Sequence, residues 1–381
     1  MGDKRYLFTP GPTPVPPEVL AACALPIVHH RGPDFRRVYD RCLARLKDVF
    51  RTENEVLLFA ASGTGTMESA IANLCSPGER VCVVSAGAFG ERWAAIAGAY
   101  GCEVDRVAYE WGEVPSADDL AWRLAERESR VVLLTHSETS TGVVADVRAL
   151  VGAAKEAGAI GVVDAISSLG AVPLETDEWG VDVVISGSQK ALMSPPGLAV
   201  VSVSQAAWDA RGTLPRFYFD WERTRKAQAA FDAAFTPAVS LVLGLDVALG
   251  MILERGLEAA FERHVRLGRA CREGIKAMGL ELFSPDDDSA AVVTAVRAPE
   301  GIDAGELLLL LRDRHGVTLA PGQGELKGKL FRIGHIGYFD VFDIGTALAA
   351  VELGLTELGA DVERGVAVTR ALAAYDQPVH A

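Results

Sequence analysis

The stretch VDVVISGSQK, residues 181–190, decides how this chain folds. Its first half is a β-branched apolar run with the length and composition of a buried parallel strand. Its second half changes to small polar residues, which places Lys190 at the end of a core strand. Burial lowers the pKa of a lysine amine, so Lys190 is suited to attack a carbonyl and to hold it as an imine. The alternative is a purely structural role, in which the aliphatic part of Lys190 packs at the strand end and its ammonium group reaches solvent.

A second apolar run, residues 160–164, ends in the carboxylate of Asp164. Lys190 follows Asp164 by about one strand–connection–strand unit. Both side chains are therefore expected at the carboxyl ends of nearby strands, where open α/β sheets bind their ligands. For Asp164 alone, an ordinary loop or helix cap is the alternative.

The segment AASGTGT, residues 60–66, is a turn rich in Gly, Ser and Thr that separates an apolar run from a segment of helical composition. The free N–H groups and the positive dipole end of such a helix start can bind a phosphate. The turn is neither a Walker loop, since no Gly-Lys-Ser/Thr follows it, nor a GxGxxG dinucleotide fingerprint. By itself it is equally consistent with an ordinary helix cap.

The lysine, the aspartate and the phosphate turn together match the needs of pyridoxal 5′-phosphate. This cofactor requires a lysine for its imine and an acid that keeps its pyridine nitrogen protonated. A nicotinamide-dependent dehydrogenase is disfavoured, because no expected strand is followed by GxGxxG and a ribose-binding acid. The sequence therefore predicts a pyridoxal-phosphate site.

Composition limits the class of protein further. The chain has 381 residues, 49% of them hydrophobic, with a mean hydropathy of +0.19, which suits two domains or one large domain with an appendage. A formal net charge of −14 argues against nucleic acid as a partner. No apolar stretch suggests a membrane span or a signal peptide, and six scattered cysteines indicate reduced thiols, so we expect a cytoplasmic protein. His29 and His30 have no acidic or thiol cluster beside them, and no metal site is predicted.

Strands and helices alternate from about residue 55 to residue 203. Apolar runs predict strands at 55–59, 80–85, 130–135, 160–164, 181–186 and 198–203, and helical patterns predict helices at 66–75, 88–100, 117–127 and 146–157. This βαβ order predicts an α/β fold with a mainly parallel sheet that helices cover on both faces.

The two ends of the chain are predicted to differ from this central part. The Pro-rich segment 9–17 favours an extended arm, residues 211–235 are expected to be irregular, and a long helix at 238–276 contains glycines that kink or split it. Strands near 291–297 and 329–334 with helices at 303–315 and 341–359 indicate a smaller α+β domain. We predict an N-terminal arm at 1–20, a large cofactor-binding domain at 21–260 and a small C-terminal domain at 261–381.

With these residues in view, the chain resembles the class V aminotransferases of pyridoxal-phosphate fold type I, most closely the alanine–glyoxylate and serine–glyoxylate aminotransferase group. The resemblance extends from TPGP at 9–12 to FRIG at 331–334, and its most specific motif is SGSQKAL at 186–192. It implies that Lys190 is the Schiff-base lysine and catalytic base, and that Asp164 pairs with the pyridine nitrogen. It also implies a homodimer with active sites at the subunit interface.

The same resemblance implies the phosphate contacts. Ser62, Gly63 and Thr64 would bind the phosphate with help from Gln189. Thr236 would reach across the dimer interface to the phosphate of the neighbouring subunit. Many relatives carry a Tyr near this point, whereas Phe235 offers no hydroxyl.

Contacts with the cofactor ring and the substrate are implied as well. Phe89 would stack on the ring, where several relatives have Trp, Ile166 would pack on the opposite face, and Thr139 would hydrogen-bond the phenolic oxygen. Without the resemblance, the first two are ordinary core residues and Thr139 belongs to a Ser/Thr turn.

Arg332 lies in an apolar run and therefore needs an anionic partner. The resemblance implies that this partner is the substrate carboxylate. The alternative is a structural ion pair. Gly11 would let the arm's backbone approach the substrate.

The implied reaction is ping-pong transamination from a small amino acid, such as alanine or serine, to a 2-oxo acid such as glyoxylate or pyruvate. Aminotransferases for phosphonate or pyridoxamine-type substrates and a non-catalytic relative of the same fold are alternatives. A cysteine desulfurase would need a reactive cysteine on a mobile loop of the second domain. The only cysteine in the C-terminal third, Cys271, falls inside an expected helix, which disfavours this alternative.

Overall fold

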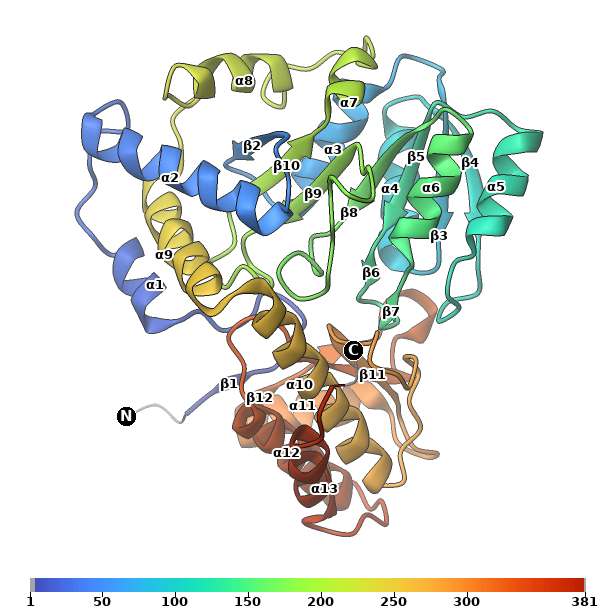
Figure 1. The fold of residues 1–381 in the computed structure, drawn as a ribbon. Coiled ribbons are helices and arrows are strands. Elements are labelled where there is room, and N and C mark those ends of the chain that lie inside the picture. Colours follow the sequence, from blue (N-terminus) through green and yellow to red (C-terminus); the bar gives the residue numbers. More distant parts are fainter. Residues whose placement is uncertain (1–3, 380–381) are drawn as a thin grey trace.

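A seven-stranded sheet forms the centre of the computed structural model, which describes residues 4–379 (Figure 1). The strand order is β2-β10-β9-β8-β5-β3-β4. The strands are β2 (Glu55–Phe59), β3 (Arg80–Ser85), β4 (Glu103–Ala108), β5 (Val131–Thr135), β8 (Ile160–Asp164), β9 (Val183–Gly187) and β10 (Ala199–Val203). Only β10 runs antiparallel to its neighbours. The predicted α/β fold with a mainly parallel sheet is confirmed.

Helices cover both faces of this sheet because alternate strand residues point to opposite sides (Figure 1). One face packs against helices that contribute Leu46, Leu120, Leu150 and Leu245 to a single apolar core, and the other packs against helices that contribute Met67, Ile71, Trp93 and Trp208. The first group comprises α2 (Pro33–Phe50), α5 (Ala117–Glu126), α6 (Val147–Glu156) and α9 (Val239–Arg255), and the second α3 (Gly63–Leu74), α4 (Ala88–Ala99) and α7 (Gln205–Asp209).

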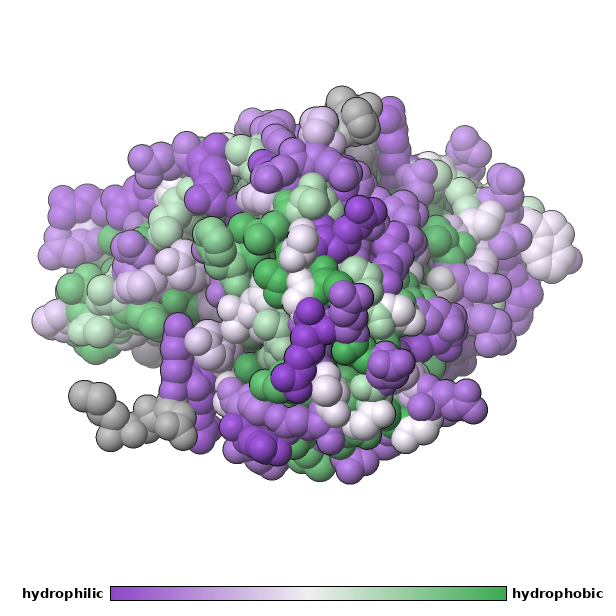
Figure 2. Space-filling view, turned by 90° about the horizontal axis from the view of Figure 1, so that it is seen from below, coloured by the Kyte–Doolittle hydropathy of each residue, from purple (hydrophilic) through white to green (hydrophobic). Residues whose placement is uncertain are grey.

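A smaller C-terminal unit consists of a three-stranded antiparallel sheet and the helices packed on it. Its elements are α10 (Leu257–Ala277), β11 (Val293–Arg297), α11 (Ala304–His315), β13 (Ala320–Pro321), β14 (Leu330–Gly334), α12 (Val341–Glu357) and α13 (Val366–Tyr375), with a 3-10 turn at Gly324–Leu326. Figure 2 views the molecule from below and shows hydrophobic residues gathered toward the middle of a mostly hydrophilic face.

The arm before the large sheet lies between these two parts. Strand β1 (Tyr6–Leu7) pairs with β12 (Val317–Thr318) next to the C-terminal unit. Helix α1 (Pro17–Cys23) then packs against α9, so the extended part ends at residue 16, before the predicted end of the arm. A short hairpin, β6 (Ser137–Glu138) with β7 (Val143–Val144), follows β5. The domain boundaries at 20 and 260 stay a prediction, and residues 1–3 and 380–381 lie outside the described residues.

Several predicted elements need correction. Strand β4 was not predicted, because three of the six residues in its sequence EVDRVA are charged and the strand is only partly buried at the sheet edge. Residues 211–235 were expected to be irregular but contain α8 (Trp221–Ala229), which the Asp220 side chain caps and the buried Trp221 anchors. Helix α3 begins at Gly63 rather than residue 66. The predicted long helix does split, at Gly256, into α9 and α10.

Within the described part, no helix combines the length and apolarity needed to cross a membrane.

Gly256 provides a test of this split, because its φ of 89° and ψ of 143° are accessible mainly to glycine. A Cβ at this position would meet no atom within 4 Å, so the cost of Gly256→Ala is backbone strain alone. We expect a loss of about 1–3 kcal/mol in unfolding free energy by chemical denaturation. The control Gly98→Ala, in an ordinary position of α4 with the same open space, is expected to be neutral or stabilising by up to about 1 kcal/mol. Equal losses in both variants would contradict this explanation.

Candidate active site

The carboxyl ends of β8 and β9 meet at one edge of the sheet, because the two strands are parallel and in register, with Asp164 opposite Ile185. A cavity of about 280 Å³ opens at this edge. It is lined by Gly11, Pro12, Ser62, Gly63, Thr64, Phe89, Arg92, Ser137, Asp164, Ile166, Ser167, Gln189, Lys190 and Pro196. The structure thus brings most of the predicted site residues together; Thr139, Thr236 and Arg332 are the predicted ones outside this lining.

Lys190 is buried, with 8% of its surface exposed. Its Nζ donates a hydrogen bond of 2.8 Å to the carbonyl oxygen of Pro10 in the arm. Burial lowers the pKa of the amine to about 8, against the opposing charge of Asp164, and the charges of Arg332 and Arg92 add to the lowering. A substantial neutral fraction, which nucleophilic attack on a carbonyl requires, is therefore present near neutral pH.

Asp164 is buried as well, and its Oδ1 accepts a hydrogen bond of 2.8 Å from the Ile166 N–H. Burial raises the pKa of this carboxyl to about 7, although that hydrogen bond and the charges of Lys190 and Arg92 oppose the rise. A cationic partner, such as a protonated ring nitrogen, would stabilise the ionised form. Ile166 in turn packs over Gly63, where a Cβ would lie 2.6 Å from its Cδ1.

The first turn of α3 lies where the sequence predicts a phosphate cradle. Ser62 is the N-cap residue, yet its side chain makes no cap hydrogen bond, so its hydroxyl is not used by the helix. The Gln189 side chain faces the same cavity, and its buried Oε1 has no hydrogen-bond partner among the described residues. Free helix N–H groups and a free hydroxyl are donors with which proteins bind phosphate. Gln189 Oε1 is an acceptor, so a contact between Gln189 and the phosphate would have to come from its amide NH2 group.

The position of Phe89 is fixed by a buried carboxylate. Phe89 lies in the first turn of α4, and its N–H and that of Gly90 donate to Glu138 Oε2 at 2.9 and 3.1 Å. Glu138 Oε1 also accepts from the Ser140 N–H at 3.1 Å. Because Glu138 is only 3% exposed, it ties the start of α4 rigidly to the 137–142 loop.

Arg332 lies in β14 and reaches from the C-terminal unit to this loop. Its Nε and Nη2 donate to the Pro321 carbonyl oxygen at 3.0 and 2.8 Å, and its Nη1 donates to the Thr139 carbonyl oxygen. Burial lowers the pKa of the guanidinium to about 10. Within the described residues its contacts are carbonyl oxygens and not a carboxylate, so the structural ion pair weighed for Arg332 is wrong. Here Thr139 acts through its backbone; its hydroxyl contact with a cofactor stays a prediction.

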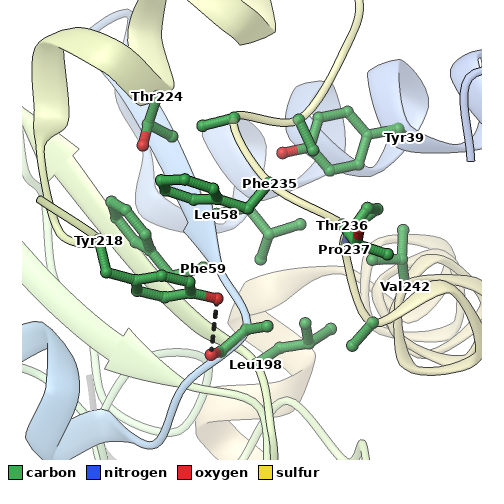
Figure 3. Close-up of a pocket in the computed structure, with 14 residues that line it drawn as sticks. Tyr39, Leu58, Phe59, Leu198, Tyr218, Thr224, Phe235, Thr236, Pro237 and Val242 are labelled. Carbon is green, nitrogen blue, oxygen red and sulfur yellow. Dashed lines mark hydrogen bonds between the residues drawn. The ribbon is translucent and has the colours of Figure 1, made fainter.

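Thr236 lies in a different, smaller cavity of about 30 Å³ (Figure 3). In that cavity the rings of Tyr218 and Phe235 stack with centroids 5.0 Å apart, and the Tyr218 hydroxyl donates to the carbonyl oxygen of Ala60, at the start of the phosphate turn, at 3.4 Å. The contact of Thr236 with a neighbouring subunit's phosphate stays a prediction.

Sequence reasoning missed several lining residues, above all Arg92. It lies three residues after Phe89 and therefore on the same helix face, a spacing that is readable in the sequence. The sequence carries no comparable signal for Pro12, Ser137, Ser167 and Pro196, because only the folded loops bring them to the cavity.

No group of three or more potential metal ligands occurs in residues 4–379. Cys271 is fully buried in α10, and burial raises the pKa of its thiol to about 12.

Fold and site together define an α/β enzyme with a buried lysine–aspartate pair beside the first turn of a helix. The family model described as aminotransferase class-V matches residues 5–326, and the chain belongs to this family, as its sequence indicated. It is 46% identical to a protein of Synechococcus sp. named soluble hydrogenase, small subunit (94% of this chain, 95% of that one). It is 36% identical to the serine–glyoxylate aminotransferase of Methylorubrum extorquens (97% and 95%). The solved ureidoglycine–glyoxylate aminotransferase of Bacillus subtilis matches with a TM-score of 0.93 at 30% identity, covering 99% of both chains.

Gly11 is predicted to control the position of Lys190. Its φ is +145°, and a Cβ would lie 2.3 Å from Lys190 Cδ and Cε. Because these atoms belong to a flexible side chain, Gly11→Ala should displace the lysine while the protein stays folded. The positive φ at this position should also lower the unfolding free energy of the variant by about 1–3 kcal/mol. We expect the absorbance of lysine-bound cofactor, measured after addition of pyridoxal phosphate, to fall at least about tenfold at limiting cofactor. An unchanged binding curve with an unchanged melting temperature would show that Gly11 has no such role.

The raised pKa of Asp164 predicts a pH-dependent stability of the cofactor-free protein. Because the folded state holds this proton more tightly than the unfolded state, the contribution is fully present below about pH 4 and is lost as pH rises through about 7. The unfolding free energy of the wild type relative to Asp164→Asn should therefore fall between pH 5 and pH 7, by on the order of 1 kcal/mol or more. Asp34→Asn, at a site 72% exposed, is the control and should show no such trend. Parallel pH profiles for the wild type and Asp164→Asn would refute the prediction.

Proposed function

We propose that this protein is a pyridoxal-phosphate-dependent aminotransferase that moves an amino group from a small amino acid, such as alanine or serine, to a 2-oxo acid such as glyoxylate or pyruvate. The observation that carries the proposal is the juxtaposition of Lys190 and Asp164 in one buried cavity beside the α3 cradle. Glyoxylate as acceptor is supported by the names of two similar proteins, in which it is the common element. The name hydrogenase is not carried over, because the residues lining this cavity include no cysteine.

The residues present fit pyridoxal phosphate. Lys190 supplies an amine with a lowered pKa for the imine, and Asp164 supplies a buried carboxyl that gains by facing a protonated ring nitrogen. Ser62 and Gln189 supply polar groups that nothing else in the described residues uses. When bound, the cofactor supplies an electron-accepting ring that stabilises the charge left at the substrate Cα after its proton is removed.

Arg332 is suited to bind the substrate carboxylate. A guanidinium has five N–H donors, and here Nε, Nη1 and Nη2 each donate once to a backbone carbonyl. One N–H on each terminal nitrogen is therefore left, which is the pair that a bidentate carboxylate contact uses. Lys190 would then take the proton from the substrate Cα, because its lowered pKa keeps part of it neutral near pH 7.

A homodimer with active sites at the subunit interface is part of the proposal. Leu20, Leu25 and Ile27, on and just after α1, are 50%, 54% and 70% exposed, and large apolar side chains that stay exposed together favour an interaction surface. The position of Thr236 outside the Lys190 cavity of its own chain agrees with a contact made across that interface. All six cysteines are unpaired, which supports a reducing compartment such as the cytoplasm.

The proposal is tested by adding pyridoxal phosphate and then single amino acids to the purified protein and recording absorbance. We expect a visible band from lysine-bound cofactor that the true donor abolishes and glyoxylate or pyruvate restores. Lys190→Ala should lack the band and lose activity by about a thousandfold or more, since base catalysis and covalent attachment are both removed. Lys226→Ala, which alters a lysine that is 74% exposed, is the control. Cofactor attached after borohydride reduction to a peptide without Lys190 would overturn the assignment.

A further inference from the structure

Arg92 lies in the cavity without a role in the proposed reaction. It is on α4, one turn after Phe89, and lines the same space as Lys190 and Asp164. Its guanidinium carbon lies 4.6 Å from the centroid of the Phe89 ring. Its Nη1 donates a hydrogen bond of 3.2 Å to Thr64 Oγ1. Arg92 therefore joins the residue expected to stack on the cofactor ring to a residue expected to bind the phosphate.

The hydrogen bonding of the two neighbouring threonines differs. The Thr66 hydroxyl donates to the Gly63 carbonyl oxygen at 2.6 Å, a local bond that uses its proton inside the helix. Thr64 Oγ1 accepts from Arg92 and donates to no acceptor in the part of the chain that the structure describes. Because a hydroxyl has one donor and two acceptor positions, Arg92 occupies an acceptor position and the Thr64 O–H is left to donate into the cavity.

The ring of Phe89 is constrained in a similar way. A guanidinium over an aromatic face is attracted by the ring quadrupole, so Arg92 favours one orientation of Phe89 and covers only one of its faces. The backbone of Phe89 is already fixed by Glu138. No carboxylate of the described residues forms a salt bridge with Arg92, whose recorded contacts are Thr64 and the Phe89 ring.

We propose that Arg92 is a positioning residue for the cofactor: it orients the Thr64 hydroxyl as a donor to the phosphate and holds the Phe89 ring in place for stacking. This inference rests on the proposed pyridoxal-phosphate site. It assigns Arg92 an indirect role, through Thr64 and Phe89, and not a direct contact with the phosphate or the substrate. A phosphate accepts hydrogen bonds, so a cradle in which the Thr64 O–H is left to donate is complementary to it.

The test compares pyridoxal phosphate with pyridoxal, which lacks the phosphate, as probes for Arg92→Met, Thr64→Val and the double variant. Each single variant should weaken the binding of pyridoxal phosphate about tenfold. The double variant should bind at most about fivefold more weakly than Thr64→Val, well short of the product of the two single losses, because only the Phe89 contact of Arg92 acts independently of Thr64. Thr64→Val should leave pyridoxal binding unchanged, and Arg92→Met should weaken it only about fivefold or less, through Phe89. Arg92→Lys, which keeps a donor for Thr64, should recover most of the binding affinity that depends on the phosphate.

Controls separate positioning from a general structural role. The circular dichroism of bound cofactor in the visible range should change in Arg92→Met, while the melting temperature of the cofactor-free protein should stay within about 2 °C. Arg148→Met, at a site 68% exposed, should change neither. Additive losses in the double variant would show that Arg92 contacts the ligand directly, and equal losses for both probes would show that the phosphate is not involved; either result overturns the inference. Failure of the wild type to bind pyridoxal phosphate at Lys190 would instead overturn the proposed function.

Discussion

Burial of two ionisable groups at the carboxyl ends of adjacent parallel strands is the constraint on which this structure depends. Lys190 and Asp164 are both almost without solvent contact, and burial shifts their pKa values in opposite directions, toward the neutral forms. Parallel register delivers both to one edge, because β8 and β9 are matched residue for residue. The proposed aldehyde cofactor, with its ring nitrogen protonated, would satisfy both groups at once, and this would offset the cost of burying the pair.

The second feature of the site is how few residues tie its parts together. Glu138 and Ser140 hold the start of α4, and with it Phe89. Between them the Thr139 carbonyl accepts from Arg332, which belongs to the C-terminal unit. The tripeptide 138–140 therefore connects Phe89, Arg332 and the large sheet. Its buried carboxylate and close backbone contacts keep these groups in a fixed relation, as catalysis by orientation requires.

Much of the site was predictable because its residues follow apolar strands in a fixed order. Asp164 is the last residue of β8, and Lys190 and Ser62 follow the ends of β9 and β2 within one short turn. The ends of parallel strands converge at one edge of a sheet. Arg92 was missed although its helical spacing from Phe89 is visible in the sequence. The missed strand β4 and helix α8 lack strong apolar patterns, since one is at a sheet edge and the other is a polar helix anchored by a single tryptophan.

The sequence by itself determined the alternation of strands and helices, the parallel sheet and the lysine–aspartate pair, because hydrophobic periodicity and residue order are local properties of the chain. Only the tertiary structure decided which groups satisfy one another. That Arg332 donates to two carbonyls and no carboxylate, that Glu138 fixes Phe89, and that Arg92 leaves the Thr64 hydroxyl as a donor are contacts between residues far apart in the chain or on different elements. Such contacts depend on packing geometry, which no local pattern encodes.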